Sequence, residues 1–136
     1  MSSTINFILV DNDPLNNMLN TILIRQLKGG AAITTFTDPE EALDYIETAY
    51  TWVNGKQTIL LLDLIMPEMD GWGFIEKFRK FPERISDHFQ TYILSSSIDD
   101  DDYKRASSIP MIKGYVEKPL KNEFLEELFT RRQVLN

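Results

Sequence analysis

The chain has 136 residues, 43% of them hydrophobic and 26% charged, which is enough for one domain with its own core. Its formal net charge of −7 argues against direct binding of nucleic acid, whose phosphates attract basic surfaces. The absence of cysteine excludes disulfides, thiolate metal sites and cysteine nucleophiles.

We expect a single domain over residues 1–136, with its core at about 5–130. The opening apolar run at residues 5–10 is far shorter than the roughly 20 residues of a membrane span. Nothing near the N-terminus resembles a secretion signal. A cytoplasmic protein without a membrane partner is therefore expected.

Apolar runs of strand length alternate with segments of helical periodicity. The predicted strands cover residues 5–10, 32–36, 58–63, 89–94 and 113–117. This alternation is typical of an α/β fold, in which a doubly wound parallel sheet is covered by helices. The run at 58–63 is the most apolar in the chain, so we place it at the centre of the sheet.

The first two of five predicted helices are recognised by their start and stop residues. Apolar side chains recur at steps of three and four residues from Leu15 onward, and a pair of glycines at 29–30 ends that helix. Asp38 supplies an N-cap for the second helix, which runs to about residue 50. An Asn54-Gly55 turn follows.

The other three helices are predicted from their apolar faces. The third ends near Pro82, the fourth is a short helix at about 98–108, and the last begins after Pro119. Their apolar positions are Phe74, Ile75 and Phe78 in the third, Ile98, Tyr103 and Ala106 in the fourth, and Phe124, Leu125, Leu128 and Phe129 in the last.

Polar residues stand at the carboxyl ends of four predicted strands. They are Asp11-Asn12-Asp13, Asp63, Ser95-Ser96-Ser97 and Lys118-Pro119. In doubly wound sheets, ligands bind at this edge, where the strand order reverses. If the first and third strands are neighbours there, Asp11 and Asp63 come together and repel each other. A proton on one of them would relieve the repulsion, but a hard cation such as Mg²⁺ between them is the simpler answer.

A carboxylate beside a divalent ion can attack phosphorus when cations neutralise the charge on the transferred oxygens. Lys118 is placed to supply such a charge, and the Ser95 hydroxyl can donate a hydrogen bond to the phosphoryl group. Taken singly, these residues could be caps, turn residues or surface residues. As a set at one edge they favour phosphoryl chemistry on Asp63.

Together the motifs resemble the response regulator receiver family over nearly the whole chain. The matching segments are Val10-Asp11-Asn12-Asp13-Pro14, residues 62–71, Leu94-Ser95-Ser96 and Tyr115-Val116-Glu117-Lys118-Pro119. The resemblance implies a flavodoxin-like fold, with five helices around a five-stranded parallel sheet in the order 2-1-3-4-5. It also implies a stand-alone receiver of a two-component or phosphorelay system.

The resemblance assigns catalytic and switching roles. Asp63 is the expected phosphoacceptor, and Lys118 the cation that contacts the phosphoryl group. Ser95 is the expected switch hydroxyl, and Tyr115 the aromatic residue that rotates with it. Asp13 is expected to cap the first helix.

The resemblance also assigns metal ligands. Asp11, Asp63 and the backbone carbonyl of Ile65 would hold Mg²⁺ or Mn²⁺. Asn12 stands where the family has a second acidic residue, so it would hold the ion weakly or through a water. An amide oxygen carries no full charge, and we therefore expect weaker Mg²⁺ binding than in a receiver with the acid.

The expected function is a signalling switch, not an enzyme, although self-phosphorylation from small donors and autodephosphorylation are intrinsic to such domains. The phosphodonor would be a sensor histidine kinase or a histidine phosphotransfer protein. The fourth helix, fifth strand and last helix would form the face for an unknown downstream protein. The chain would be a monomer or a weak, phosphorylation-dependent dimer.

Two alternatives remain open. Asn12 favours a pseudo-receiver, a binding module that acts without phosphorylation. An aspartyl-phosphate phosphatase or a flavin carrier fits poorly. Ile65 stands where such a phosphatase needs a second Asp, and acidic residues follow the first strand where a flavin phosphate needs hydroxyls and glycines.

Overall fold

A computed structural model gives the fold and describes residues 5–49, 57–96 and 99–135. The predicted Asn54-Gly55 turn and the predicted positions of Ser97 and Ile98 lie outside these ranges. No helix of the described part is long and apolar enough to cross a membrane.

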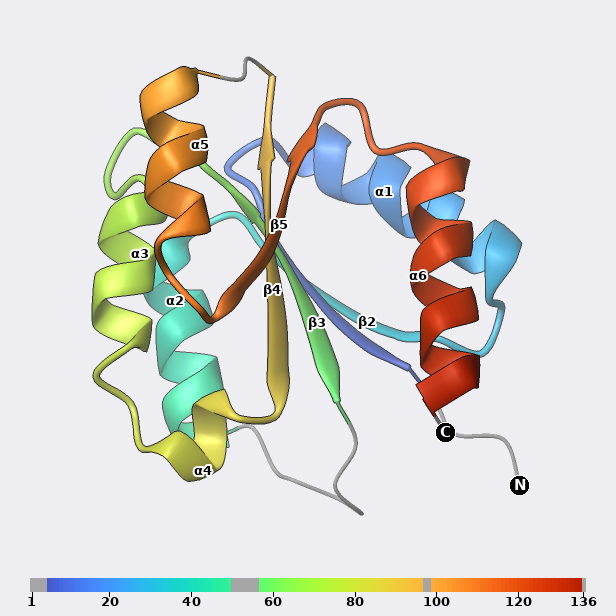
Figure 1. Cartoon of the computed structure of the whole chain (residues 1–136), viewed down its shortest axis with the longest axis horizontal. Helices are drawn as coiled ribbons and strands as arrows, with labels where there is room; N and C mark the ends of the chain where they lie inside the picture. The colour runs from blue at the N-terminus through green and yellow to red at the C-terminus, as the bar shows by residue number, and fades with distance from the viewer. Residues whose placement is uncertain (1–4, 50–56, 97–98, 136) are drawn as a thin grey trace.

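Five parallel strands form one sheet in the order β2-β1-β3-β4-β5, which confirms the predicted fold class and strand order (Figure 1). The strands are β1 (Asn6–Val10), β2 (Ala32–Phe36), β3 (Thr58–Asp63), β4 (Phe89–Ser95) and β5 (Ile112–Glu117). All six residues of β3 are buried between β1 and β4, because helices cover both faces of the sheet there. The central position predicted for this strand is therefore confirmed.

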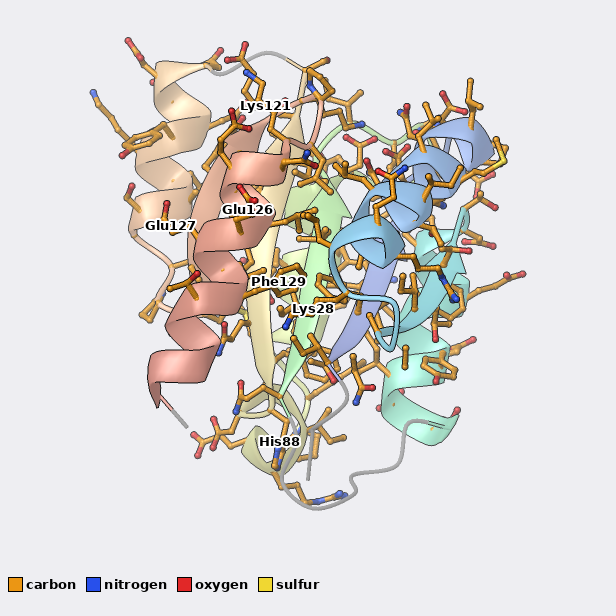
Figure 2. The ribbon with its side chains drawn as sticks, turned by 90° about the vertical axis from the view of Figure 1, so that its right-hand side faces the viewer. Lys28, His88, Lys121, Glu126, Glu127 and Phe129 are labelled. Atoms are coloured by element: carbon orange, nitrogen blue, oxygen red, sulfur yellow. The ribbon has the colours of Figure 1, made fainter. Side chains whose placement is uncertain are left out.

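Helices cover the sheet in two layers (Figure 1). One layer holds α1 (Pro14–Leu27) and α6 (Asn122–Leu135), and the other holds α2 (Pro39–Asp44), α3 (Gly71–Phe78) and α5 (Asp100–Ser107). In the first layer Lys28 lies with its ammonium 5.6 Å from the ring of Phe129, at the end of α1 (Figure 2). That ring also makes an edge-to-face contact with Phe7 of β1, which joins α6 to the sheet.

The prediction of five helices was incomplete, because a sixth, α4 (Glu83–Ser86), precedes β4. It has four residues and buries only Ile85, so it is too short to show a helical period in the sequence.

The second predicted helix also differs in detail: α2 ends at Asp44 and continues as a π-helical segment, Tyr45–Ala49. Its predicted N-cap is confirmed, since the Asp38 side chain accepts a hydrogen bond from the Glu40 amide.

The apolar faces predicted for α3 and α6 are confirmed. Phe74, Ile75 and Phe78 are buried between α3 and the sheet, and Leu125, Leu128 and Phe129 are buried under α6. The short α5 differs: Ala106 is buried as expected, but Tyr103 is 55% exposed.

Helix α1 places much of its apolar stripe on the outside. Leu15, Met18, Leu19 and Ile22 are each about half exposed, at 53%, 53%, 52% and 47%. The buried residues of this helix are Asn17 and Ile24. The first half of α1 thus turns a polar side chain toward the interior, and the periodicity that predicted the helix did not indicate which side faces the sheet.

Candidate functional site

The carboxyl edge of the sheet brings three charged side chains from three strand ends together. Asp11 follows β1, Asp63 ends the neighbouring β3, and both are nearly fully buried, at 4% and 5% exposure. The Lys118 ammonium lies 2.8 Å from Asp11 Oδ2 and 3.2 Å from Asp63 Oδ1. One ammonium therefore bridges the two carboxylates.

Asp11 is held by the turn that leads into α1. Its carboxylate accepts hydrogen bonds from the Asp13 amide at 2.9 Å and from the Asn16 side chain at 3.4 Å. The buried Asn17 side chain donates to the carbonyls of Asp11 and Phe36, each at 3.1 Å. Asn17 thus joins the end of β1 to the end of β2, which explains why the inner side of α1 is polar here.

Asn17 was not among the residues predicted from the sequence. In the sequence it is only the second of two adjacent amides, Asn16-Asn17, which is equally compatible with an exposed helix residue. Asp13 lies where it was expected: its side chain accepts from the Leu15 amide and caps α1, which confirms the predicted role.

Asp63 is held against the start of α3. The Gly71 amide donates to the Leu64 carbonyl at 2.8 Å, and a Cβ on residue 71 would lie 2.9 Å from Leu64 Cα and 3.0 Å from the Asp63 carbonyl oxygen. Only glycine allows α3 to begin this close to the strand end. The Ile65 amide lies 3.4 Å from Asp63 Oδ1, and the Ile65 side chain is exposed.

The two carboxylates carry more negative charge than one lysine balances. Burial raises the pKa of Asp63, the charge of Asp11 raises it further, and Lys118 only partly opposes them. Burial lowers the pKa of Lys118, but the hydrogen bond to Asp11 and the charges of both carboxylates bring that pKa above its ordinary value. The site holds a firmly charged lysine and an acid whose ionised form needs further positive charge.

A second pair of side chains extends from this edge toward α5. Ser95 ends β4 and is 1% exposed, and Tyr115 stands on the neighbouring β5 with its hydroxyl buried. Burial raises the pKa of the Tyr115 hydroxyl, which an interaction with Ser95 partly opposes. The Tyr115 ring lies 6.3 Å from the ring of Tyr103 on α5. The predicted switch residues thus lie between the Asp63 edge and α5.

A family model described as "Response regulator receiver domain" matches residues 7–130. The chain belongs to this family. Receiver domains are the signalling switches of two-component systems, and they accept a phosphoryl group from sensor kinases or phosphotransfer proteins.

Curated relatives match the receiver over most of its length. It is 29% identical over 119 residues to the "Probable methanogenesis regulatory protein FilR2" of Methanothrix harundinacea, covering 88% of this chain and 75% of that protein. It is 26% identical over 117 residues to the "Cyclic di-GMP phosphodiesterase response regulator RpfG" of Xanthomonas campestris. That match covers 86% of this chain but only 29% of the relative.

Solved structures match the receiver as a whole. A response regulator receiver protein from Dyadobacter fermentans is 26% identical, with a TM-score of 0.82 over 94% of this chain and 97% of that chain. A two-component response regulator from Cytophaga hutchinsonii is 28% identical, with a TM-score of 0.81 over 95% and 97%. The fold and the family assignment agree.

Receiver domains typically bind Mg²⁺ at the phosphorylation site, and the residues of this receiver fit such an ion. Mg²⁺ prefers oxygen ligands and keeps several waters, so two carboxylates and a backbone carbonyl can hold it. Asp11 and Asp63 are within reach of one cation, as their shared lysine indicates. In the described ranges no group of three or more acidic or histidine side chains could hold a metal.

Asn12 lies beside this pair without replacing the family's acid. Its side chain is exposed and lines a hollow of about 320 Å³ together with Asp38 and Glu68. Neither Asp11 nor Asp63 lines this hollow, so a contact of Asn12 to the metal stays a prediction.

Proposed function

We propose that the chain forms one receiver domain that accepts a phosphoryl group on Asp63 in an Mg²⁺-dependent reaction. The observation that carries this proposal is the single ammonium of Lys118 between the buried carboxylates of Asp11 and Asp63. Such an arrangement places a nucleophile and a phosphate-binding cation together, out of bulk water.

In the proposed reaction, an Asp63 carboxylate oxygen forms a bond to phosphorus. The bond from phosphorus to the donor breaks, and its electron pair leaves with the donor, which takes up a proton. The ion, when bound, neutralises charge on the transferred oxygens. Lys118 contributes a second positive charge, and Ser95 a hydroxyl donor, from the two neighbouring strand ends. Attack by water on phosphorus reverses the modification.

The proposed output is a change in the surface formed by α5, β5 and α6. A phosphoryl group on Asp63 would draw the Ser95 hydroxyl toward it, and Tyr115 packs next to Ser95. Tyr115 contacts Tyr103 on α5, so movement of the serine changes the packing beneath that helix. A downstream protein that binds this surface would then distinguish the two states.

The exposed apolar patch of α1, formed by Leu15, Met18, Leu19 and Ile22, supports a protein as phosphodonor. The helix begins at Pro14, three residues after Asp11, and contains no acidic residue, in a chain of net charge −7. A hollow of about 550 Å³ between α1 and the Lys118 loop connects the patch with the site. A donor histidine must reach Asp63, and an apolar helical surface of the donor protein would fit here.

Intact-mass measurement tests the proposal. The protein is incubated with a small phosphodonor and Mg²⁺, and we expect a mass increase of one phosphoryl group. Asp63→Asn removes the nucleophile and retains the shape of the side chain, so it should show no increase. A chelator should also prevent the reaction. An adduct that persists in Asp63→Asn, or that forms without metal, would contradict the proposal.

Asn12 favours one alternative, the phosphorylation-independent pseudo-receiver, because it reduces the negative charge offered to the metal. Trp72 follows Gly71, which packs on Asp63, so its fluorescence should report on this edge. We expect Mg²⁺ with a phosphoryl mimic to change that fluorescence in the natural chain and much less in Asp63→Asn. No response at millimolar Mg²⁺ would favour the alternative.

A further inference from the structure

Trp72 joins the start of α3 to α5. It is the second residue of α3 and is 7% exposed, although tryptophan carries a polar N–H group. That group donates a hydrogen bond to the Asp102 carboxylate at 3.1 Å. The Arg105 guanidinium lies 4.6 Å from the centre of the Trp72 ring, within the range of a cation–π contact. Asp102 and Arg105 are three residues apart on α5, so two side chains on one face of that helix contact the same indole.

Apart from Trp72, helix α5 packs mainly on β5, with Ala106 in the core. Its sequence, Asp100–Ser107, contains a run of charged residues, and within it only Ala106 is buried. Tyr103 contacts the Tyr115 ring but remains 55% exposed. A helix without an apolar stripe depends on its individual contacts for its position. The contacts with Trp72 are therefore a major part of what holds α5 on the neighbouring α3, which lies beside it in Figure 1.

The other side of Trp72 is fixed to the phosphoacceptor strand. Gly71, the preceding residue, donates its amide to Leu64 and leaves no space for a Cβ against the Asp63 carbonyl. The Asp70 side chain caps the same helix end by accepting from the Gly73 amide at 2.8 Å. The backbone that carries the indole is thus packed against the end of β3, and the indole itself contacts α5.

We propose that Trp72 is a latch between the Asp63 edge and α5, acting in parallel with the Ser95 and Tyr115 pair. In this role Trp72, Asp102 and Arg105 are positioning residues: they hold α5 and transmit a shift of the β3–α3 turn to its surface. That Trp72 holds α5 is independent of phosphorylation. That it transmits the state of Asp63 rests on the proposed function.

Hydrogen exchange of the α5 amides in metal-free protein tests the holding role. Asp102→Ala removes the acceptor of the indole N–H, and we expect the α5 amides to exchange about tenfold faster. Asp101→Ala is the matched control, because it removes the same charge from the first turn of α5 and its side chain is exposed. Trp72→Phe keeps an aromatic ring but removes the donor, and it should act like Asp102→Ala. Arg105→Ala should act in the same direction, and Lys104→Ala is its control.

The transmitting role is tested with beryllofluoride and Mg²⁺ as a phosphoryl mimic. In the natural chain and in Asp101→Ala the mimic should change α5 exchange, and in Asp102→Ala and Trp72→Phe this change should fall at least twofold. Intact mass after reaction with a small phosphodonor is measured for every variant.

These measurements distinguish the latch from the proposed phosphorylation of Asp63. Absence of the phosphoryl adduct in the natural chain would contradict the proposed function but not the latch. The latch itself is wrong if the α5 amides exchange no faster in Asp102→Ala and Trp72→Phe than in Asp101→Ala and the natural chain. Its role in transmission is wrong if the mimic changes α5 exchange equally with and without the latch.

Discussion

Asp63 is held where its charged form is disfavoured. Burial and the charge of Asp11 raise its pKa more than Lys118 lowers it. A carboxyl whose pKa is higher in the folded than in the unfolded chain binds protons more readily when folded. The free energy of unfolding therefore falls as the pH rises from the pKa of the unfolded chain to that of the folded chain. Above the folded pKa, the ionised Asp63 destabilises the fold by its full amount.

Asp63→Asn should remove this cost. In metal-free buffer at pH 7 we expect the variant to gain roughly 1 kcal/mol in free energy of unfolding, an ordinary size for one substitution. Lys118 keeps its contact with Asp11 at 2.8 Å, so the amide leaves no unpaired lysine. The gain should vanish below the unfolded pKa, where the natural acid is neutral. Urea unfolding across a pH series measures the gain at pH 7 and its loss at low pH. A gain that does not depend on pH would show that it does not come from the charge of Asp63.

At the scale of elements, the strand ends could be predicted and the helix contacts could not. Parallel strands bring their carboxyl ends to one edge, so the polar residues at the ends of β1, β3 and β5 already indicated a cluster. The side of α1 that faces the sheet depends on Asn17 and its two carbonyl partners, Asp11 just after β1 and Phe36 at the end of β2. The contact between Trp72 and α5 joins residues 30 apart in sequence, and no local pattern marks it.

The α1 patch carries a prediction of its own. Leu19 is 52% exposed, so Leu19→Glu should leave the fold intact while placing a charge in the proposed docking surface. We expect phosphotransfer from a phosphohistidine donor protein that modifies the natural chain to slow about tenfold, since buried apolar contacts dominate such interfaces. Phosphorylation by a small donor should not change.

Gln26→Glu is the control for this prediction, because it adds the same charge to an exposed position near the far end of α1. Rates are followed by intact mass or by a phosphate-sensitive gel. Equal slowing by both variants would indicate a general charge effect. Slowing with the small donor as well would place the defect in the Asp63 site.

At the scale of the whole molecule, the site couples metal binding to folding. The two carboxylates meet only in the folded chain, because Asp11 and Asp63 are 52 positions apart and are brought together by the β1–β3 pairing. An ion that binds the folded form alone stabilises it according to its concentration relative to its dissociation constant. At ten times that constant, the gain is about 1.4 kcal/mol. This raises the melting temperature by a few degrees for a domain of this size.

Thermal unfolding with and without Mg²⁺ therefore reports on the site through the stability of the entire fold. The natural chain should show a rise in melting temperature that Asp63→Asn lacks.

Asn12→Asp restores a charge at the exposed position next to Asp11, and it should bind Mg²⁺ roughly tenfold more tightly. The melting temperature of Asn12→Asp should thus rise at lower Mg²⁺, whereas Gln26→Glu, which adds the same charge at an exposed position near the far end of α1, should behave like the natural chain. If Asp63→Asn shows the same rise as the natural chain, the ion binds elsewhere on this acidic surface, and the proposed ligands are wrong.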